Sequence, residues 1–164
     1  MDEAINKFLA TIGTTIGEAV TEIAETMLFV EIEAGSVDTQ PCDVKREYCV
    51  WIDFDGEIQG CFTLIAIERS ALKLSSALLG EDRLEMDAEM SDAFGEVANM
   101  VAGGLKTRVE EQYGPASMTP PTLGQKEEES QEVVRVHQAF SLDGVPFCAE
   151  VTFTKEFILR KIAA

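Results

Sequence analysis

Residues 91–105 of the chain read SDAFGEVANMVAGGL, and this stretch decides how the rest of the sequence is interpreted. Apolar residues recur here at steps of three and four, which is the spacing of one buried face of an α-helix. They are Met90, Phe94, Val97, Val101 and Leu105. We expect a helix from about residue 86 to residue 113, because Asp87 is a favourable N-cap and Gly114-Pro115 a favourable stop.

The opposite face of this helix carries an unusual set of side chains. At about 100° per residue, Glu96 and Asn99 project away from the apolar stripe. The same outward side holds Asp92, Gly95 and Gly103. Glycine weakens a helix interior by about 0.5–1 kcal/mol relative to alanine. Two glycines on an exposed face therefore predict that a partner comes close to it.

Composition limits the fold and the function classes. The chain has 164 residues, of which 46% are hydrophobic, so we expect one folded domain over residues 1–164. Its formal net charge is −17 at pH 7. Such a charge argues against nucleic acid and against an anionic membrane surface, because both would repel the protein.

Targeting signals and metal-ligand spacings are both missing from the sequence. The chain begins Met-Asp-Glu, without a basic leader and without an apolar run that could cross a bilayer, which predicts a cytoplasmic protein. The four cysteines, Cys42, Cys49, Cys61 and Cys148, show no CxxC spacing, and the chain has one histidine. We therefore expect no metal site.

The remaining segments alternate between helix and strand patterns. In order, the sequence predicts a helix over residues 2–27, a strand over 29–33, a loop over 35–43, strands over 48–54 and 58–67 joined by Asp55-Gly56, a helix over 69–79, an extended connection over 115–125, a charged loop over 126–132, strands over 133–142 and 145–154 joined by Asp143-Gly144, and a short tail segment over 157–162. Asp-Gly between two β-rich runs is a strong hairpin signal.

The order of helix followed by hairpin occurs twice. Ala19-x-x-Glu22-Ile23-Ala24-Glu25 aligns with Ala93-x-x-Glu96-Val97-Ala98-Asn99, and the two Asp-Gly pairs follow in the same order. This predicts an internal pseudo-repeat, roughly residues 1–80 and 86–162. Because the strands come as hairpins, the fold class is α+β, with a largely antiparallel sheet and two long helices packed on it.

The pattern Asp92-x3-Glu96-x2-Asn99, followed by MVAGGLK over residues 100–106, resembles the active helix of the CheC/CheX/FliY chemotaxis phosphatases. That family carries an Asp/Ser-x3-Glu-x2-Asn signature. The length, acidity and duplicated plan resemble the family too, so the resemblance covers nearly the whole chain. It is closest to the CheX branch, which has one working signature, because the first repeat has Glu25 where the asparagine would be.

The resemblance implies a CheC-like fold and a phosphatase that acts on phosphorylated CheY-type response regulators in two-component chemotaxis signalling. It implies that Asn99 orients the attacking water and that Glu96 pairs with the receiver's active-site lysine. Asp92, Gly95 and Gly103 would contribute to docking. The Mg²⁺ ion would belong to the receiver, and this chain would bind no cofactor of its own. The resemblance also implies a homodimer formed through sheet edges.

Two other readings of the sequence stay open. A non-enzymatic adaptor of the flagellar switch or signalling pathway would keep the fold and bind a receiver without speeding hydrolysis; the retained Asn99 favours the enzyme. An unrelated acidic protein would carry Glu-x-x-Asn by chance, since that pattern alone is weak. For Asp92, a docking contact and a plain solubilising helix charge remain alternatives.

Overall fold

The computed structural model describes residues 3–126 and 133–163. Its elements, in order, are α1 (Glu3–Ile23), the π-helical turn η1 (Ala24–Leu28), β1 (Glu33–Asp38), β2 (Tyr48–Gly56), β3 (Gly60–Ala66), α2 (Glu68–Leu79), α3 (Ala88–Tyr113), β4 (Ala116–Met118), β5 (Thr122–Gly124), β6 (Val133–Leu142), β7 (Val145–Thr154) and α4 (Lys155–Ala163). Among these residues no helix is long and apolar enough to span a membrane.

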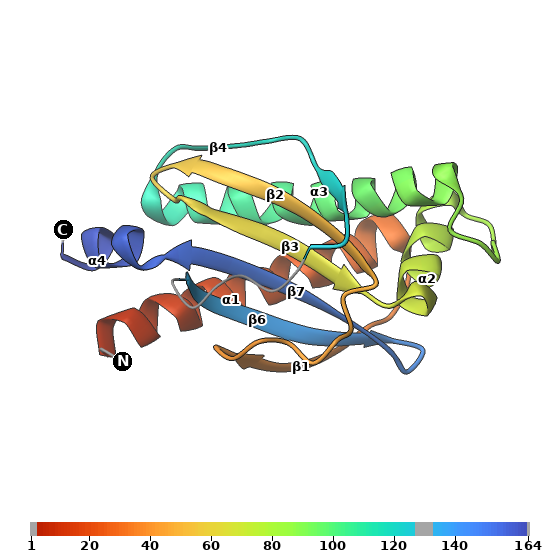
Figure 1. Cartoon of the computed structure of the whole chain (residues 1–164), viewed down its shortest axis with the longest axis horizontal. Coiled ribbons are helices and arrows are strands. Elements are labelled where there is room, and N and C mark those ends of the chain that lie inside the picture. The colour runs from red at the N-terminus through yellow and green to blue at the C-terminus, as the bar shows by residue number, and fades with distance from the viewer. Residues whose placement is uncertain (1–2, 127–132, 164) are drawn as a thin grey trace.

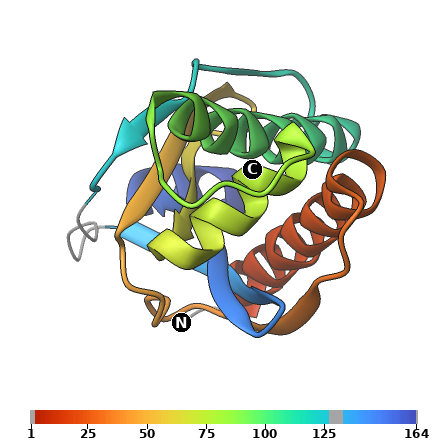
Figure 2. The ribbon, with the colours of Figure 1, turned by 90° about the vertical axis from the view of Figure 1, so that its right-hand side faces the viewer.

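One sheet organises the described part of the chain. Its seven strands are antiparallel and lie in the order β1-β6-β7-β3-β2-β4, with β5 also pairing with β2. Helices α1 and α3 lie behind the sheet in Figure 1. Figure 2 shows them side by side on the same face, with α2 at the end nearest the viewer. The expected α+β fold, an antiparallel sheet with two long helices on it, is confirmed.

The main core fills the space between the helices and this face of the sheet. Burying one large apolar side chain contributes about 1.5–3 kcal/mol, so the core fixes how α1 and α3 lie on the sheet. The largest fully buried side chains in it include Phe62, Phe94, Phe147, Phe153, Leu9, Ile12, Ile16, Ile52 and Leu64.

The other face of the sheet carries a second, smaller cluster. Cys49, Ile65 and Cys148 are fully buried there, although no helix within residues 3–126 and 133–163 covers them. Cys42 and Val44 come from the irregular segment between β1 and β2 and pack against this cluster, as does Trp51. Trp51 therefore belongs to the outer face rather than to the main core.

The predicted strand over residues 29–33 is wrong. Phe29 instead has φ 54° and ψ 44° and ends the first helix, and the strand begins at Glu33. All residues of β1 are exposed, so the strand lacks the alternating apolar pattern that a sequence can reveal. Residues 35–38, which were expected in a loop, are part of β1.

Of the two predicted Asp-Gly turns, one is confirmed. Asp143 and Gly144 both have positive φ, 52° and 77°, as a two-residue turn of the I′ kind requires. The first turn is displaced: β2 continues through Gly56, which pairs with Ala116 of β4, and the chain reverses over residues 57–59. Pairing with β4 holds these residues in the ladder.

The end of the first helix also departs from its apolar stripe. The spacing of three and four residues from Ile16 through Val20 and Ile23 continues to Met27, yet Met27 is 46% exposed, whereas Leu28 is 5% exposed. The cause is η1, because a π-helical turn accommodates one extra residue and rotates everything after it by about 100°. The predicted tail segment is the helix α4, and the charged loop predicted over residues 126–132 lies outside the described residues except for Lys126.

Candidate functional site

Helix α3, which carries the predicted site, is fixed at both ends. The Asp87 carboxylate accepts a hydrogen bond from the Met90 backbone N–H at 2.9 Å, and this bond holds the pKa of Asp87 below its usual range. Gly114 closes the other end, and its N–H donates to the Glu110 carbonyl at 3.0 Å. The helix therefore starts and stops close to where the sequence predicts.

The loop before α3 is bound to its first turn by Arg83. The guanidinium contacts the carboxylates of Glu81 at 2.9 Å, of Asp87 at 2.6 Å and of Glu89. These three contacts, with Glu89 contributing most, raise the pKa of Arg83. Because all four groups are exposed or half-buried, we assign them to local ordering rather than to the stability of the whole fold.

The apolar stripe of α3 faces the core as predicted. Its five members are all buried, with exposed fractions of 3% or less: Met90, Phe94, Val97, Val101 and Leu105. The helix cannot turn about its axis without exposing them. The orientation of its outward face is therefore fixed by packing.

On that outward face, Glu96 and Asp92 are exposed and Asn99 is half-buried. Glu96 and Asn99 are three residues apart, about 4.5 Å along the helix axis. Among the described residues, neither side chain forms a hydrogen bond or an ion pair, so both groups remain available to an external partner. A carboxamide offers both a donor and an acceptor without charge, and a carboxylate accepts from a cation.

Within the described part of the chain, no neighbouring residue crowds the two glycines of this face. Apart from its chain neighbours and the nearby backbone of α3, a Cβ added at Gly95 or at Gly103 would meet no atom of the described residues within 4 Å. The glycines of α1 differ, because a Cβ at Gly13 would lie 2.4 Å from Val37 and one at Gly17 would lie 2.3 Å from Gln138. Gly95 has little accessible surface of its own, yet the space above it is open.

The corresponding face of the first copy is built differently. Glu22, the counterpart of Glu96, is bound by the Arg108 guanidinium at 2.5 Å, and Arg108 comes from α3. Glu25, the counterpart of Asn99, lies in η1 rather than in regular α-helix. This face thus differs from that of α3 in its partner, its backbone and its side chain. Sequence alone could not reveal Arg108 as the partner, because the pair joins two helices that are distant in the chain.

A further group of polar residues lies on the helix-free face of the sheet. The Glu150 carboxylate is 1% exposed and contacts Arg46 at 3.2 Å and Arg135 at 3.6 Å. Among the described residues, no group of three or more histidine, cysteine, aspartate or glutamate side chains could hold a metal ion. This ion-pair group could not be predicted from the sequence, because its members are distributed over a loop and two strands.

Comparisons with known proteins match the chain to one family. Residues 48–143, more than half of the chain, match the family model described as chemotaxis phosphatase CheX. The CheY-P phosphatase CheX of Thermotoga maritima is 28% identical over 107 residues, which are 64% of this chain and 69% of that protein.

Crystal structures with the same fold include two CheX proteins. The chemotaxis protein CheX from Vibrio vulnificus has a TM-score of 0.76 at 20% identity, covering 86% of this chain and 97% of that one. CheX from Borrelia burgdorferi, in a CheX-CheY-BeF3-Mg complex, has a TM-score of 0.70 at 23% identity, covering 87% of this chain and 97% of that one.

Proposed function

Because the chain belongs to the CheX family of chemotaxis phosphatases, we propose that it speeds hydrolysis of the aspartyl phosphate on a CheY-type response regulator. The Thermotoga maritima relative is named a CheY-P phosphatase, and the Borrelia burgdorferi relative was crystallised with CheY and Mg²⁺. In this chain, the observation that carries the proposal is the outward-facing pair of Glu96 and Asn99 on α3, neither of which is engaged within the described residues.

In this proposal, Asn99 enters the receiver's site and orients the attacking water. The carboxamide oxygen accepts a hydrogen bond from that water, so the water lone pair is directed at phosphorus while the receiver's aspartate leaves. An uncharged group suits this position, because a carboxylate would repel the incoming phosphoryl oxygens. By the same argument, we assign no activity to the first copy, which has Glu25 at this place.

Glu96 has a different role in the proposal. It pairs with the receiver's active-site lysine and fixes the position of α3 along the receiver, one helical turn from Asn99. Gly95 and Gly103 allow the receiver's loops to approach the helix, and Asp92 adds a docking contact at the same face. The Mg²⁺ ion is supplied by the receiver, where the aspartyl phosphate is held.

The test is the decay of a phosphorylated CheY-type receiver with Mg²⁺ present. Added wild-type protein is expected to speed the decay. Asn99→Ala should lower that acceleration at least about a hundredfold, as removal of one positioned polar group typically does. Gln112→Ala is the matched control, since it removes an exposed carboxamide from the same helix. Asn99→Ala should melt at the wild-type temperature, because its side chain makes no hydrogen bond within the described residues.

Glu96→Ala should mainly weaken receiver binding, and Glu111→Ala provides the control for loss of an exposed carboxylate from α3. Unchanged affinity of Glu96→Ala would contradict the role of Glu96. If wild-type protein binds the phosphorylated receiver without speeding its decay, the chain is an adaptor instead. If it binds neither form, both functions are excluded.

The remaining parts of the proposal concern the protein as a whole. We place it in the cytoplasm, as one domain over residues 1–164 with pseudo-repeats at roughly 1–80 and 86–162. The α1 and α3 helices packed side by side and the β2-β3 and β6-β7 hairpins support the duplication. We also propose a homodimer formed through sheet edges, with β1 as a suitable edge because all its residues are exposed. Light scattering on the purified protein tests the dimer.

A further inference from the structure

All four cysteines of the chain lie on or beside the helix-free face of the sheet. Cys49, Cys61 and Cys148 are buried in β2, β3 and β7, and Cys42 is half-buried in the irregular segment of residues 39–47, which packs over Cys49 and Cys148. Cys42 packs directly against the cluster that contains Cys148. Neither thiol has a part in the proposed phosphatase, because α3 lies on the opposite face.

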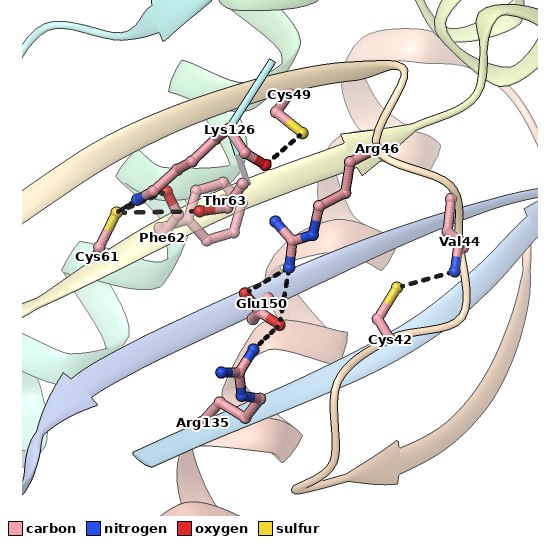
Figure 3. Close-up of polar contacts among 10 residues, drawn as sticks. All are labelled: Cys42, Val44, Arg46, Cys49, Cys61, Phe62, Thr63, Lys126, Arg135 and Glu150. Carbon is pink, nitrogen blue, oxygen red and sulfur yellow. Dashed lines mark hydrogen bonds and ion pairs between the residues drawn. The ribbon is translucent and has the colours of Figure 1, made fainter. Parts of the chain in front are cut away.

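The surroundings of Cys42 stabilise a thiolate. The Val44 backbone N–H donates to its sulfur at 3.4 Å, as Figure 3 shows. The charges of Glu150 and Arg46, which contact each other, act on the Cys42 pKa in opposite directions, and Glu150, which raises it, has the larger effect. The side-chain contact with Cys148 is the largest cause that lowers the pKa of Cys42, and burial opposes it only in part. The thiolate is the nucleophilic form of cysteine, so Cys42 is the reactive thiol of the group.

The other three thiols have the opposite character. Burial raises the pKa of Cys49, of Cys61 and of Cys148. Lys126 donates to the Cys61 sulfur at 3.1 Å without reversing this effect. These thiols stay protonated and, being buried, are not exposed to a reagent in solution.

Strand register decides which of these cysteines can form a disulfide. Cys49 pairs with Ile65, and Ile65 pairs with Cys148, so a whole strand separates Cys49 from Cys148. Two strand spacings are about 9.5 Å, beyond the Cα separation of about 7 Å that a disulfide tolerates. Cys61 lies four residues along β3 from Ile65, about 13 Å away. Cys42 comes from an irregular segment rather than from a paired strand, and Cys148 is the thiol that its side chain lies beside.

We propose that Cys42 and Cys148 form a reversible thiol pair that neutral hydroperoxides oxidise to a disulfide. The Cys42 thiolate attacks one peroxide oxygen, the O–O bond breaks, and Cys42 becomes a sulfenic acid while hydroxide leaves. The Cys148 sulfur then attacks the Cys42 sulfur and expels hydroxide. The Cys148 proton and one from solvent convert the two hydroxides to water. Overall, two thiols and one hydrogen peroxide give one disulfide and two waters.

The approach to Cys42 favours an uncharged oxidant. A surface groove runs beside the segment and is lined by Asp38, Asp43 and His137 among others. The whole chain is also strongly acidic, with a net charge of −17. An anionic disulfide such as oxidised glutathione is therefore repelled, whereas hydrogen peroxide is not.

The test begins with the reduced wild-type protein and hydrogen peroxide, followed by alkylation and non-reducing peptide mapping by mass spectrometry. The expected product is one linked peptide joining Cys42 to Cys148, with two hydrogen atoms lost from the intact mass and full reversal by dithiothreitol. Cys49 and Cys61 act as internal controls and should remain reduced. Oxidised glutathione at the same concentration should give much less product.

Two variants separate the steps. Cys148→Ala should leave a Cys42 sulfenic acid that dimedone captures, and Cys42→Ser should give no disulfide. Oxidation first at Cys49 or Cys61 overturns the proposal. The proposal is also overturned if the mass of the protein stays unchanged while a free-cysteine peptide in the same tube is oxidised. Both contrary outcomes are observed on the wild-type protein alone, so the proposal can be refuted even if the Cys148→Ala variant fails to fold.

Discussion

Replacing Gly95 by alanine separates the needs of the fold from those of docking. Gly95 lies in the interior of α3, and among the residues that the structure describes an added Cβ meets nothing within 4 Å beyond its own stretch of helix. Alanine is better than glycine in a helix interior by about 0.5–1 kcal/mol. For a domain of this size, 1 kcal/mol raises the melting temperature by about 2–4 °C, so Gly95→Ala should melt about 1–4 °C higher than wild type.

The same methyl group should impair the proposed activity. If a receiver loop packs against Gly95, an extra methyl costs about 1–3 kcal/mol of binding, as overpacking does in a filled core. That is a loss in affinity of about five- to a hundredfold. We therefore expect a more stable and less active protein, measured by thermal unfolding and by receiver dephosphorylation at several protein concentrations.

Gly104→Ala is the matched control, because its Cβ would make ordinary contacts with α1, at 3.6 Å from the Ala19 Cβ. It lies on the side of α3 that faces α1 and should leave receiver affinity unchanged. A Gly95→Ala variant that is more stable and fully active would refute the docking role of this glycine. A melting temperature of Gly95→Ala below that of wild type would instead show that the added methyl group is crowded.

Three further predictions concern stability. Glu150→Ala should destabilise the fold by about 3–5 kcal/mol in urea unfolding, because it leaves its two arginine partners without a buried counter-charge. Glu57→Ala, which removes an exposed carboxylate, should change the free energy of unfolding by about 0.5 kcal/mol or less. Equal effects of the two substitutions would contradict the structural role of Glu150. Hydrogen bonding lowers the pKa of folded Asp87, so its contribution is present above its unfolded pKa of about 3.9 and is lost as the pH falls below that value. Asp87→Asn keeps the cap, and its melting temperature should fall less between about pH 5 and pH 3 than that of wild type; parallel curves would exclude the effect. Phe29→Gly should raise stability by about 1 kcal/mol, because the wild-type residue is exposed and has positive φ; a loss of stability would show that its ring packs usefully.

The sequence predicted those parts of the fold that periodic burial determines. Helix α3, the helix α2 and the four long hairpin strands follow from apolar spacing and strong turn residues, such as Asp143-Gly144. Strand β1 could not be found because no residue in it is buried, while the apolar residues just before it imitate a strand. The short β4 and β5 strands depend on pairing with β2, which is a tertiary contact.

The candidate site shows the same division. The faces of Glu96, Asn99 and Asp92 followed from helical spacing, because the buried stripe of α3 is complete. The open space at Gly95 needed coordinates, since the sequence does not distinguish it from the crowded Gly13. The contact of Cys42 with Cys148 was also out of reach, because it depends on how residues 39–47 fold back over the sheet.

The two borders of the sheet differ, and the difference limits how copies of the chain can assemble. Along β2, the border consists of the three-residue strands β4 and β5, with Pro120 and Pro121 between them, and proline donates no ladder hydrogen bond. Among the strands that the structure describes, the six-residue β1 is the longer border strand. A contact between two β1 strands would be isologous, so it would use the β1 border of both copies and leave neither copy with a second such border. Assembly by this route closes at two copies, whereas a sheet with two equivalent borders could add copies without end.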